Sequence, residues 1–546
     1  MNCRTIFSNY FGQRNRGWVL SLIAMAALVY LPFLGSPFVF DDLNFFSSRA
    51  ARYYTTSISN FDLRWLPSAT LAWTQTLFLD APHVYRLGNL LLHAVNVVLL
   101  FFLLHQLTSL ATQPQRKISY SHWGAWLGAL FFACHPVAVY AVGYMIQRSI
   151  LMATLFTLAM QLTYLRGLIN GQKRWLAVSV LFYFLAVFSK EHSLMAPAIV
   201  IATTVLLRSK IRADKQALWI TWLGYLIIGG FVALRAKGVF GATYEIDAAN
   251  LLEQQSVTET SMTLHLLSIF TQTGLYFKYL LLWWLPNPAW MSVDMRETFT
   301  SSLGAWQNWL KAAGFILYAL VAYRLLLRRG RAGLIGLALL YPWLFFLVDL
   351  STIRVQEPFV LYRSYLWMPG MMLLIPLLVS TLPNRKRTVI ALTVVTLSLV
   401  PLSWNRLWVF GDDYRLWNDA ALLLPNEYTP GAARIYYNRG MAELGVSQWD
   451  KAIKDFERVK VINPEIEQVY VNIGKADFSL GRYQEAISNF NQAIALKPDY
   501  ADAYFAKGMT LKRLHADDEA LTNIIKSCDL GNKTACLIIS FLNRPK

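Results

Sequence analysis

The feature that most constrains this chain is a series of apolar segments, each about 20 residues long, that recurs through the first 404 residues. A helix of that length can cross the ~30 Å hydrocarbon layer of a bilayer. Hydrophobic residues make up 55% of the 546 residues and the mean hydropathy is +0.37, which is too apolar for a soluble enzyme of this length. The predicted spans are residues 17–36, 84–106, 122–140, 147–166, 175–190, 193–208, 216–236, 305–327, 333–350, 364–383 and 388–404.

The distribution of charge predicts how these spans are oriented. The net charge of +18 lies entirely in residues 1–404, because residues 405–546 hold 18 basic and 18 acidic residues. If the N-terminus is cytoplasmic, 19 of the 32 basic residues of the membrane half fall on the cytoplasmic side, beside the single acid Asp214. This arrangement obeys the positive-inside rule. The basic excess therefore indicates membrane topology, and we expect no nucleic-acid partner.

The apolar segment 264–285 is expected not to cross. If it did, the last two basic clusters would move outside, so we expect an interfacial or re-entrant helix within an external loop, 237–304. A second external loop covers 37–83. The first apolar run has no small-residue cleavage site after it and is interpreted as a retained span. The count of about eleven is odd, which puts everything after Trp404 on the external side, as Asp41 is.

The C-terminal part is predicted to be a repeat array. Several residue types recur at intervals of 34: Gly440, Gly474 and Gly508; Ala452, Ala486 and Ala520; Pro464 and Pro498; Phe456 and Phe490. This is the tetratricopeptide (TPR) pattern, with small residues where paired helices approach closely. The chain is therefore expected to be all-α: a membrane bundle over 1–404, a linker over 405–430 and a soluble TPR α-solenoid over 431–546.

Two adjacent carboxylates, Asp41 and Asp42, follow the first span in the stretch Phe38–Asn44. Ions at the edge of a bilayer are costly unless they pair or face a water-filled cavity. A solvated loop start is one interpretation and an active site is the other. Adjacent carboxylates push one pKa up, which suits one as a general base and the other as an orienting group or metal ligand. Which of the two is the base stays open, and no metal site is predicted beyond this pair.

Other polar side chains stand at the external ends of spans. Tyr85, Asn89 and His93 form a polar stripe at helical spacing, which indicates either interhelical hydrogen bonding or the lining of a site. His135 would usually be structural, whereas a guanidinium at the head of an apolar helix, as at Arg148, favours an anion.

Two further external groups complete the candidates. The first is Lys190, Glu191 and His192, in which the Lys-Glu pair can simply neutralise itself at the interface. The second is Arg363 with Tyr365, in which Arg363 heads the tenth span.

Together these residues suggest transfer of a sugar from a lipid phosphate. The phosphate leaves as an anion, so Arg148, Lys190 and Arg363 would stabilise negative charge as it develops. Asp41 or Asp42 would remove the proton of the acceptor hydroxyl. Direct displacement with a single base inverts the anomeric carbon.

In this order along the chain, the motifs resemble the GT-C superfold glycosyltransferases, and most closely the transmembrane-plus-TPR O-mannosyltransferases and their bacterial relatives. The resemblance rests on Phe38–Asp42, Tyr85–His93, His135–Arg148, Lys190–Glu191, Arg363–Leu366 and the TPR array. It implies a polyprenyl- or dolichyl-phosphate sugar donor, an external active site and a protein acceptor. It also matches Asp41 to the catalytic acid. The chain departs from the family in having only three clear repeats and no acidic residue after His135.

Two other functions fit part of the pattern. An O-antigen-ligase-type oligosaccharyltransferase is expected to carry its catalytic groups in a large late external loop, but 237–304 has only His265 and no dense Arg/His cluster. A non-enzymatic membrane-anchored TPR scaffold explains the array but not the charged span ends. We expect a bacterial inner membrane with the site and the TPR domain in the periplasm, or alternatively the lumenal side of the endoplasmic reticulum. Cys528 and Cys536 form either a bridge or two unrelated thiols.

Overall fold

The chain divides into two compact helical units. The first comprises Met1–Val293 and Glu297–Asp412, and the second comprises Asp294–Arg296 and Asp413–Lys546. The computed structural model describes residues 13–47, 53–54, 62–112, 119–236, 241–242, 248–254 and 260–542. Over these residues every regular element is a helix, as the all-α prediction requires. Parts of both predicted external loops, and the last four residues of the predicted TPR domain, lie outside the described residues.

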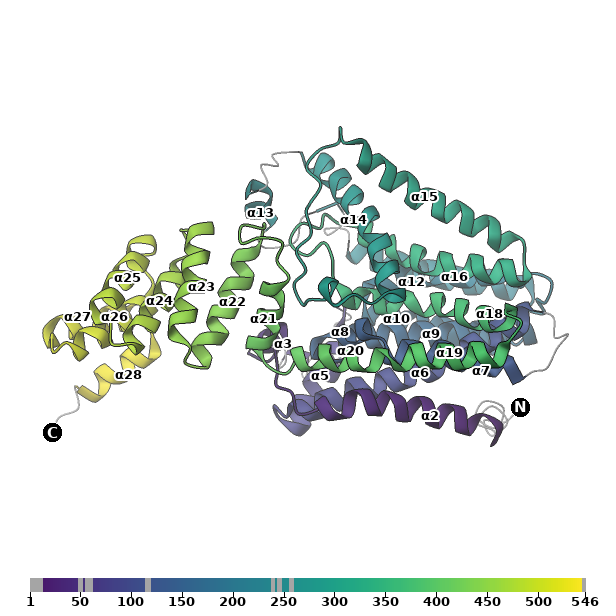
Figure 1. Ribbon diagram of the computed structural model, residues 1–546, viewed down its shortest axis with the longest axis horizontal. Coiled ribbons are helices and arrows are strands. Elements are labelled where there is room, and N and C mark those ends of the chain that lie inside the picture. The colour runs from purple at the N-terminus through teal and green to yellow at the C-terminus, as the bar shows by residue number, and fades with distance from the viewer. Residues whose placement is uncertain are drawn as a thin grey trace. The chain divides into compact units, whose positions relative to one another are not determined.

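The first unit is a bundle of long helices that lie side by side (Figure 1). Its longer helices are α2 (Gln13–Tyr30), α6 (Pro82–Ala111), α7 (Ser119–Cys134), α9 (Arg148–Asn170), α10 (Lys173–Ser189), α11 (Ala196–Leu206), α12 (Lys215–Arg235), α14 (Ser261–Trp284), α15 (Trp306–Leu327), α16 (Gly330–Phe346), α19 (Arg385–Leu397) and α20 (Leu399–Val409). Its shorter helices are α3 (Asp41–Ser47), α5 (Trp65–Phe78), α8 (Val139–Val142), α13 (Ala248–Gln254), α17 (Ser364–Trp367) and α18 (Leu374–Thr381). Its 3₁₀ turns are η1 (Leu31–Phe33), η2 (Pro136–Ala138), η3 (Met145–Gln147), η4 (Glu191–Met195), η5 (Pro288–Trp290), η6 (Asp349–Ser351), η7 (Leu361–Arg363) and η8 (Met368–Leu373).

Among the described residues, eight helices have the length and apolar composition to cross a membrane. They are Asn15–Phe33, Pro82–Ala111, Met145–Asn170, Lys215–Arg235, Trp306–Leu327, Gly330–Ser351, Leu361–Thr381 and Arg385–Val409. His122–Cys134 and Pro136–Val142, bent by 51°, make a ninth if they count as one span. Eleven were predicted. The number is lower because α10 has 17 residues and Glu191–Leu206 is also short.

These two short helices nevertheless run along the length of α9. The Lys190 ammonium donates a hydrogen bond to Gln147 just before α9 begins. The hydroxyl of Thr204 in α11 lies 2.8 Å from that of Tyr164, near the other end of α9. α10 and the η4–α11 segment thus form a hairpin that lies alongside most of α9. Because a hairpin adds two passes or none, it leaves the side on which the chain continues unchanged.

α14 packs parallel to α15, the next helix along the chain. Phe270 contacts Trp309, and two turns further along Tyr276 contacts Phe315, with ring centroids 4.9 and 5.0 Å apart. Two consecutive helices that run in the same direction can both cross a bilayer only if the chain between them crosses back. Irregular backbone exposed to lipid is excluded. This packing favours the prediction that residues 264–285 do not cross, and α14 is not among the eight helices above.

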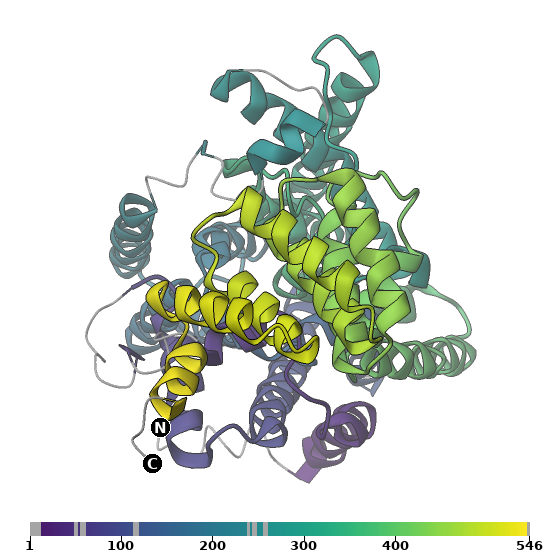
Figure 2. The ribbon, with the colours of Figure 1, turned by 90° about the vertical axis from the view of Figure 1, so that its left-hand side faces the viewer.

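The second unit is an array of antiparallel helix pairs (Figures 1 and 2). Its helices are α21 (Asp413–Leu422), α22 (Ala432–Gly445), α23 (Trp449–Ile462), α24 (Glu467–Ser479), α25 (Tyr483–Leu496), α26 (Ala501–Arg513), α27 (Asp517–Asp529) and α28 (Lys533–Leu542). The repeating glycines have the predicted role, because a Cβ added to each would meet a side chain of the paired helix. These distances are 2.9 Å from Gly440 to Phe456, 2.5 Å from Gly474 to Phe490 and 2.8 Å from Gly508 to Ile524.

One prediction about this unit is wrong, and one pair of alternatives left open by the sequence is resolved. The expected linker 405–430 is largely helical: α20 continues to Val409, and α21 packs on α22 as the first helix of the second unit. The repeat periodicity does not extend to this segment, which is why the sequence pattern placed the boundary too late. Cys528 and Cys536 form a disulfide between α27 and α28, the first of the two alternatives left open.

Candidate active site

Asp42 is buried and ties the start of α3 to η3. Only 1% of the residue is exposed. Its carboxylate accepts hydrogen bonds from the backbone N–H groups of Ile146 (2.9 Å) and Val39 (3.4 Å). Burial raises the pKa of Asp42 to about 7, although these N–H groups and the Arg86 guanidinium act in the opposite direction. Asp42 therefore has a structural role, because its carboxylate fixes the start of α3 to the η3 turn.

Asp41 faces a different environment. It is partly exposed and lines a small crevice together with Tyr144, Glu357 and Tyr362. The residue before it, Phe40, adopts a left-handed backbone conformation (φ 54°) and stacks on the Tyr144 ring. The Asp41 N–H donates a hydrogen bond to the Tyr144 hydroxyl (3.2 Å). A bulky residue with positive φ costs about 1–3 kcal/mol, so the surrounding contacts hold Asp41 in place against backbone strain.

Arg86 also holds the loop before Asp41 in place, and it was not among the site residues predicted from the sequence. Its guanidinium donates to the carbonyls of Ser36 (2.9 Å), Pro37 (2.5 Å) and Gly143 (2.6 Å). A signal was present, because Arg86 stands at i−3 from Asn89 on the same face of an apolar helix, where a charged residue is rare unless it is paired.

A chain of ionic contacts joins three other loops of the first unit. Two hydrogen bonds link the Arg64 guanidinium to the Glu191 carboxylate, one of them 2.8 Å long. His192 lies between two carboxylates, with Nδ1 3.4 Å from Glu191 and Nε2 3.4 Å from Asp349. Arg363 completes the chain by donating to Asp349 at 3.3 Å. Like Phe40, Arg64 has a positive φ (65°).

Lys190 and Arg354 add two more positive charges beside this chain. Lys190 is only 3% exposed. Its ammonium donates to the Gln147 side chain (3.4 Å) and lies 4.8 Å from the centre of the Tyr362 ring, and no described carboxylate forms an ion pair with it. Arg354 is buried too. We call the following residues the charged cluster: Arg64, Lys190, Glu191, His192, Asp349, Arg354 and Arg363. It holds three arginines, one lysine and two carboxylates.

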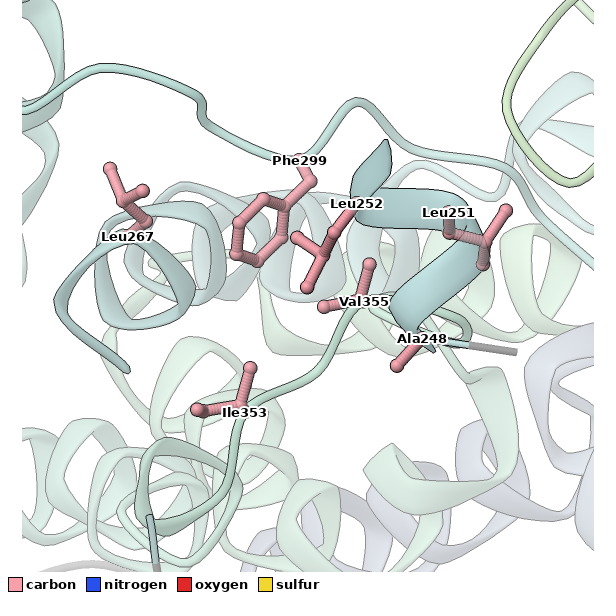
Figure 3. Packing of buried hydrophobic residues seen from close by; sticks show 7 residues of the cluster. All are labelled: Ala248, Leu251, Leu252, Leu267, Phe299, Ile353 and Val355. Carbon is pink, nitrogen blue, oxygen red and sulfur yellow. The ribbon is translucent and has the colours of Figure 1, made fainter. Parts of the chain in front are cut away.

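A hydrophobic cluster supports the segment that carries Arg354. Ile353 and Val355, on either side of it, pack with residues from α13, α14 and the chain before α15 (Figure 3). The backbone N–H of Arg354 donates to the Ser268 hydroxyl (3.0 Å). The alternation of apolar neighbours with Arg354 turns the guanidinium away from this apolar cluster and into the cavity described next.

The charged cluster borders a cavity of about 410 Å³ with both polar and apolar walls. Arg64, Glu191, His192 and Arg354 line it, and so do apolar residues from the end of α12, from η4 and from the turn between α16 and η6. A cavity of this size lies within the range of small-molecule sites. Tyr362 links the charged cluster to the Asp41 crevice, because its ring contacts Lys190 and also lines the crevice.

None of the three residues predicted to bind phosphate lines this cavity: Lys190 and Arg363 lie in the charged cluster beside it, and Arg148 is in neither. Its guanidinium donates to the Asn89 side chain (3.1 Å), the Tyr85 carbonyl (3.1 Å) and the Thr74 hydroxyl (3.3 Å). All three acceptors are neutral, and they lie on α5 and α6. The structure thus uses Arg148 to join α9 to these two helices.

The polar stripe on α6 and His135 are also engaged inside the bundle. His93 Nδ1 lies 2.7 Å from the Tyr365 hydroxyl, and the Tyr85 hydroxyl donates to the Leu79 carbonyl (3.2 Å). His135 stacks on Trp283 with ring centres 4.3 Å apart and accepts a hydrogen bond from the second residue of the turn that it caps. Of the predicted cavity-lining residues, Glu191 and His192 line the cavity. Tyr85, Asn89 and His93 take the hydrogen-bonding role that the sequence left open for them, and His135 is structural. Tyr365, predicted to line the site, instead pairs with His93 inside the bundle.

The described residues contain no group of three or more His, Cys, Asp or Glu side chains placed to hold a metal ion. Both carboxylate oxygens of Asp42 already accept backbone hydrogen bonds. A metal centre on Asp41 and Asp42, the one position that the sequence left open, therefore lacks a third protein ligand within this part of the chain.

Comparisons with known proteins bear on the second unit. The TPR repeat family model matches residues 474–514. Among solved structures, the chain is similar to the Arabidopsis OM64 TPR domain (24% identity over 20% of this chain and 93% of that one, TM-score 0.20). It is also similar to MamA (21% identity, 29% and 85%, TM-score 0.20) and to YrrB, a TPR protein (19% identity, 30% and 87%, TM-score 0.22). No curated protein matches the chain. Residues 474–514 are thus a TPR repeat.

Proposed function

We propose that this chain is a membrane glycosyltransferase of the GT-C type, which transfers a sugar from a polyprenyl- or dolichyl-phosphate donor to a protein acceptor. The observation that carries the proposal is the excess of buried positive charge in the charged cluster, connected through Tyr362 to the crevice that holds Asp41. The cavity beside the cluster also has apolar walls, which suit the first isoprene units of such a donor.

The charge balance of the cluster suits the leaving group better than the donor. A sugar phosphodiester carries one negative charge, whereas the phosphomonoester that departs carries about −1.5 to −2. Within the cluster the four basic side chains outnumber the two carboxylates by two, whereas Asp41 and Glu357 of the adjoining crevice add negative charge on the acceptor side. The attraction of the nearest cations for the phosphate grows as the glycosidic bond breaks. Interactions that strengthen toward the transition state accelerate the reaction. Arg64 and Arg354 are the cations of the cluster that line the cavity, and Lys190, which has no carboxylate partner among the described residues, adds its charge beside the Tyr362 ring.

Asp41 is assigned as the general base and Asp42 as the residue that holds it. Asp41 lines the crevice, while the Asp42 carboxylate is occupied by two backbone N–H groups. In this scheme Asp41 takes the proton of the acceptor hydroxyl as its oxygen attacks the anomeric carbon. The carbon–oxygen bond to phosphate breaks on the opposite face, and the configuration inverts.

Sidedness supports the same scheme. The count of nine spans, with the bent pair taken as one, and the count of eleven, with α10 and η4–α11 added, are both odd. Either count puts the second unit in the same compartment as Asp41. Disulfides persist in oxidising compartments, so the bridge between Cys528 and Cys536 favours the periplasm, or the lumen of the endoplasmic reticulum. In this proposal the TPR array recruits the protein acceptor.

The test is sugar transfer in proteoliposomes supplied with a radiolabelled polyprenyl-phosphate sugar. We expect Asp41→Asn to abolish transfer. Lys190→Gln should lower kcat by about 10²–10³-fold, the cost of losing one preorganised charge-stabilising group. Asp80→Asn and Lys311→Gln alter exposed charges outside the cavity and are the matched controls. Full activity in both Asp41→Asn and Lys190→Gln refutes the assignment.

A membrane-anchored TPR scaffold is the second candidate. The observation in its favour is that the one family match lies in the TPR array. A scaffold tolerates simultaneous neutralisation of Asp41 and Lys190, provided that the protein still inserts and folds. The double variant would favour the scaffold over the enzyme if it keeps a native elution profile in detergent and also supports normal cellular function.

A further inference from the structure

A long apolar groove runs along the outside of the first unit, away from the charged cluster. Its volume is about 690 Å³, and α2, α6, α9 and α10 form its walls. α6 and α9 pack against each other, α2 packs on α6, and α10 packs on α9 (Figure 1). The lining is apolar from Leu91 to Phe102 on α6, and small side chains such as Ala159 on α9 give the groove its depth.

The length of the groove restricts what can occupy it. Leu91 and Phe102 are eleven residues apart, so the lined part of α6 is about 16 Å long at 1.5 Å per residue. This is about half of the ~30 Å hydrocarbon thickness. A spanning helix of a partner protein would need a groove along the whole bundle. A single acyl chain of one leaflet fits the observed length.

Positive charge marks one end of the groove. Arg166, in the last turns of α9, lines it and lies 4.6 Å from the centre of the Trp175 ring, which lines it too. Arg174 is exposed beside them, 5.8 Å from the same ring. Lys173 pairs with Asp214 at 3.6 Å and so adds little net charge. The aromatic ring and the two guanidinium groups stand at the turn between α9 and α10, the level where lipid headgroups begin if these helices cross the bilayer.

We infer that this groove binds one anionic phospholipid, with an acyl chain between α2, α6, α9 and α10 and its phosphate group at Arg166 and Arg174. Guanidinium groups pair with phosphate in a bidentate way, and Trp175 contributes an amphipathic ring at the same level. The site is separate from the proposed sugar-donor cavity, because no residue lines both. The inference requires membrane insertion but not catalysis.

The experiment measures lipids retained by the full-length protein. The protein is reconstituted into vesicles of phosphatidylethanolamine with one tenth phosphatidylglycerol, re-extracted in mild detergent and analysed by native mass spectrometry. Wild type should retain about one phosphatidylglycerol per chain. Arg166→Gln should lower this enrichment about fivefold, as expected for one basic residue near an anionic headgroup. Lys386→Gln removes an exposed basic residue outside the groove and should retain the lipid as wild type does.

A second variant tests the groove independently of charge. Ala159→Phe fills it and should reduce the retained lipid while leaving Arg166 in place. Loss in both variants, with wild-type retention in Lys386→Gln, supports the site. Wild-type retention of phosphatidylglycerol in either Arg166→Gln or Ala159→Phe overturns it, and so does a wild type that retains no more phosphatidylglycerol than the vesicle composition supplies.

Discussion

Replacing Asp42 with Asn should make the stability of this protein less dependent on pH. Asp42 is buried, and its carboxylate accepts hydrogen bonds from the N–H groups of Ile146 and Val39. Its pKa is raised to about 7, chiefly by burial. Asn has nearly the same shape, keeps one oxygen for the Ile146 N–H, and cannot ionise. The weaker of the two hydrogen bonds, at 3.4 Å from Val39, is the one that it gives up.

The size of the effect follows from proton linkage. An unperturbed Asp has a pKa of about 3.9, so between that value and about 7 the folded protein binds a proton at Asp42 that the unfolded chain has released. Stability therefore falls as pH rises through this window and stays low above it. Three pKa units at about 1.4 kcal/mol each give about 4 kcal/mol as an upper limit. Asp42→Asn should remove this loss and be the more stable protein at pH 8.

The assay is thermal denaturation of the detergent-solubilised protein, followed by tryptophan fluorescence between pH 4 and pH 8. Because unfolding of a membrane protein is commonly irreversible, the quantity compared is the difference in midpoint between variant and wild type at each pH. This difference should grow from pH 4 to pH 7 and then level off. Asp41→Asn is the matched control, since Asp41 is partly exposed. An equal pH slope in wild type and Asp42→Asn would refute the reasoning.

Two predictions concern the TPR array. Gly474→Ala should destabilise it by about 1–3 kcal/mol, since the new Cβ would lie 2.5 Å from the Phe490 ring, whereas Gly445→Ala, with no atom within 4 Å of its Cβ, should be neutral. Thermal denaturation of the two variants checks this, and equal midpoints would contradict it. Replacing Cys528 and Cys536 together with Ser should cost about 2–3 kcal/mol, as for a short closed loop, and should speed proteolysis of α28. In intact cells or sealed vesicles, an external maleimide that is impermeant should label the wild-type pair only after reduction. Labelling without reduction would contradict the disulfide.

The architecture could be predicted where the sequence signal is local and periodic. The long apolar helices and the 34-residue repeat both produce patterns within a single segment, so their approximate positions follow from the sequence. The linker 405–430 could not be predicted as helical, since α21 does not share the repeat periodicity and is recognised only through its packing on α22. The number of spans differs for a similar reason: α10 is short by itself, and only its position beside α9 shows how far it extends.

The candidate site depends on contacts between distant segments, and there the sequence was less informative. Arg148 and Lys190 each stand at the external end of an apolar segment, and the sequence analysis gave them the same role. In the structure Arg148 donates to three neutral acceptors on α5 and α6, whereas Lys190 lies in the charged cluster. Arg64, 127 residues before its partner Glu191, and Arg354 were missed. The sequence gives the position of each charged residue along the chain, but it does not show which of these residues lie together in the folded protein.

The two aspartates illustrate why neighbouring residues of one type take different roles here. Adjacent positions at the start of a helix point about 100° apart, so one side chain of the pair turns inward and the other outward. The inward one, Asp42, meets backbone N–H groups and fixes the loop. The outward one, Asp41, follows a residue held at positive φ, a conformation that persists only when its surroundings enforce it. Arg64, the ion-pair partner of Glu191, also has a positive φ (65°). Positive φ also occurs at Leu79, Arg329, Ser447 and His515, so what distinguishes Phe40 is the Tyr144 ring, which stacks on it and whose hydroxyl accepts a hydrogen bond from the Asp41 N–H, holding Asp41 in the crevice.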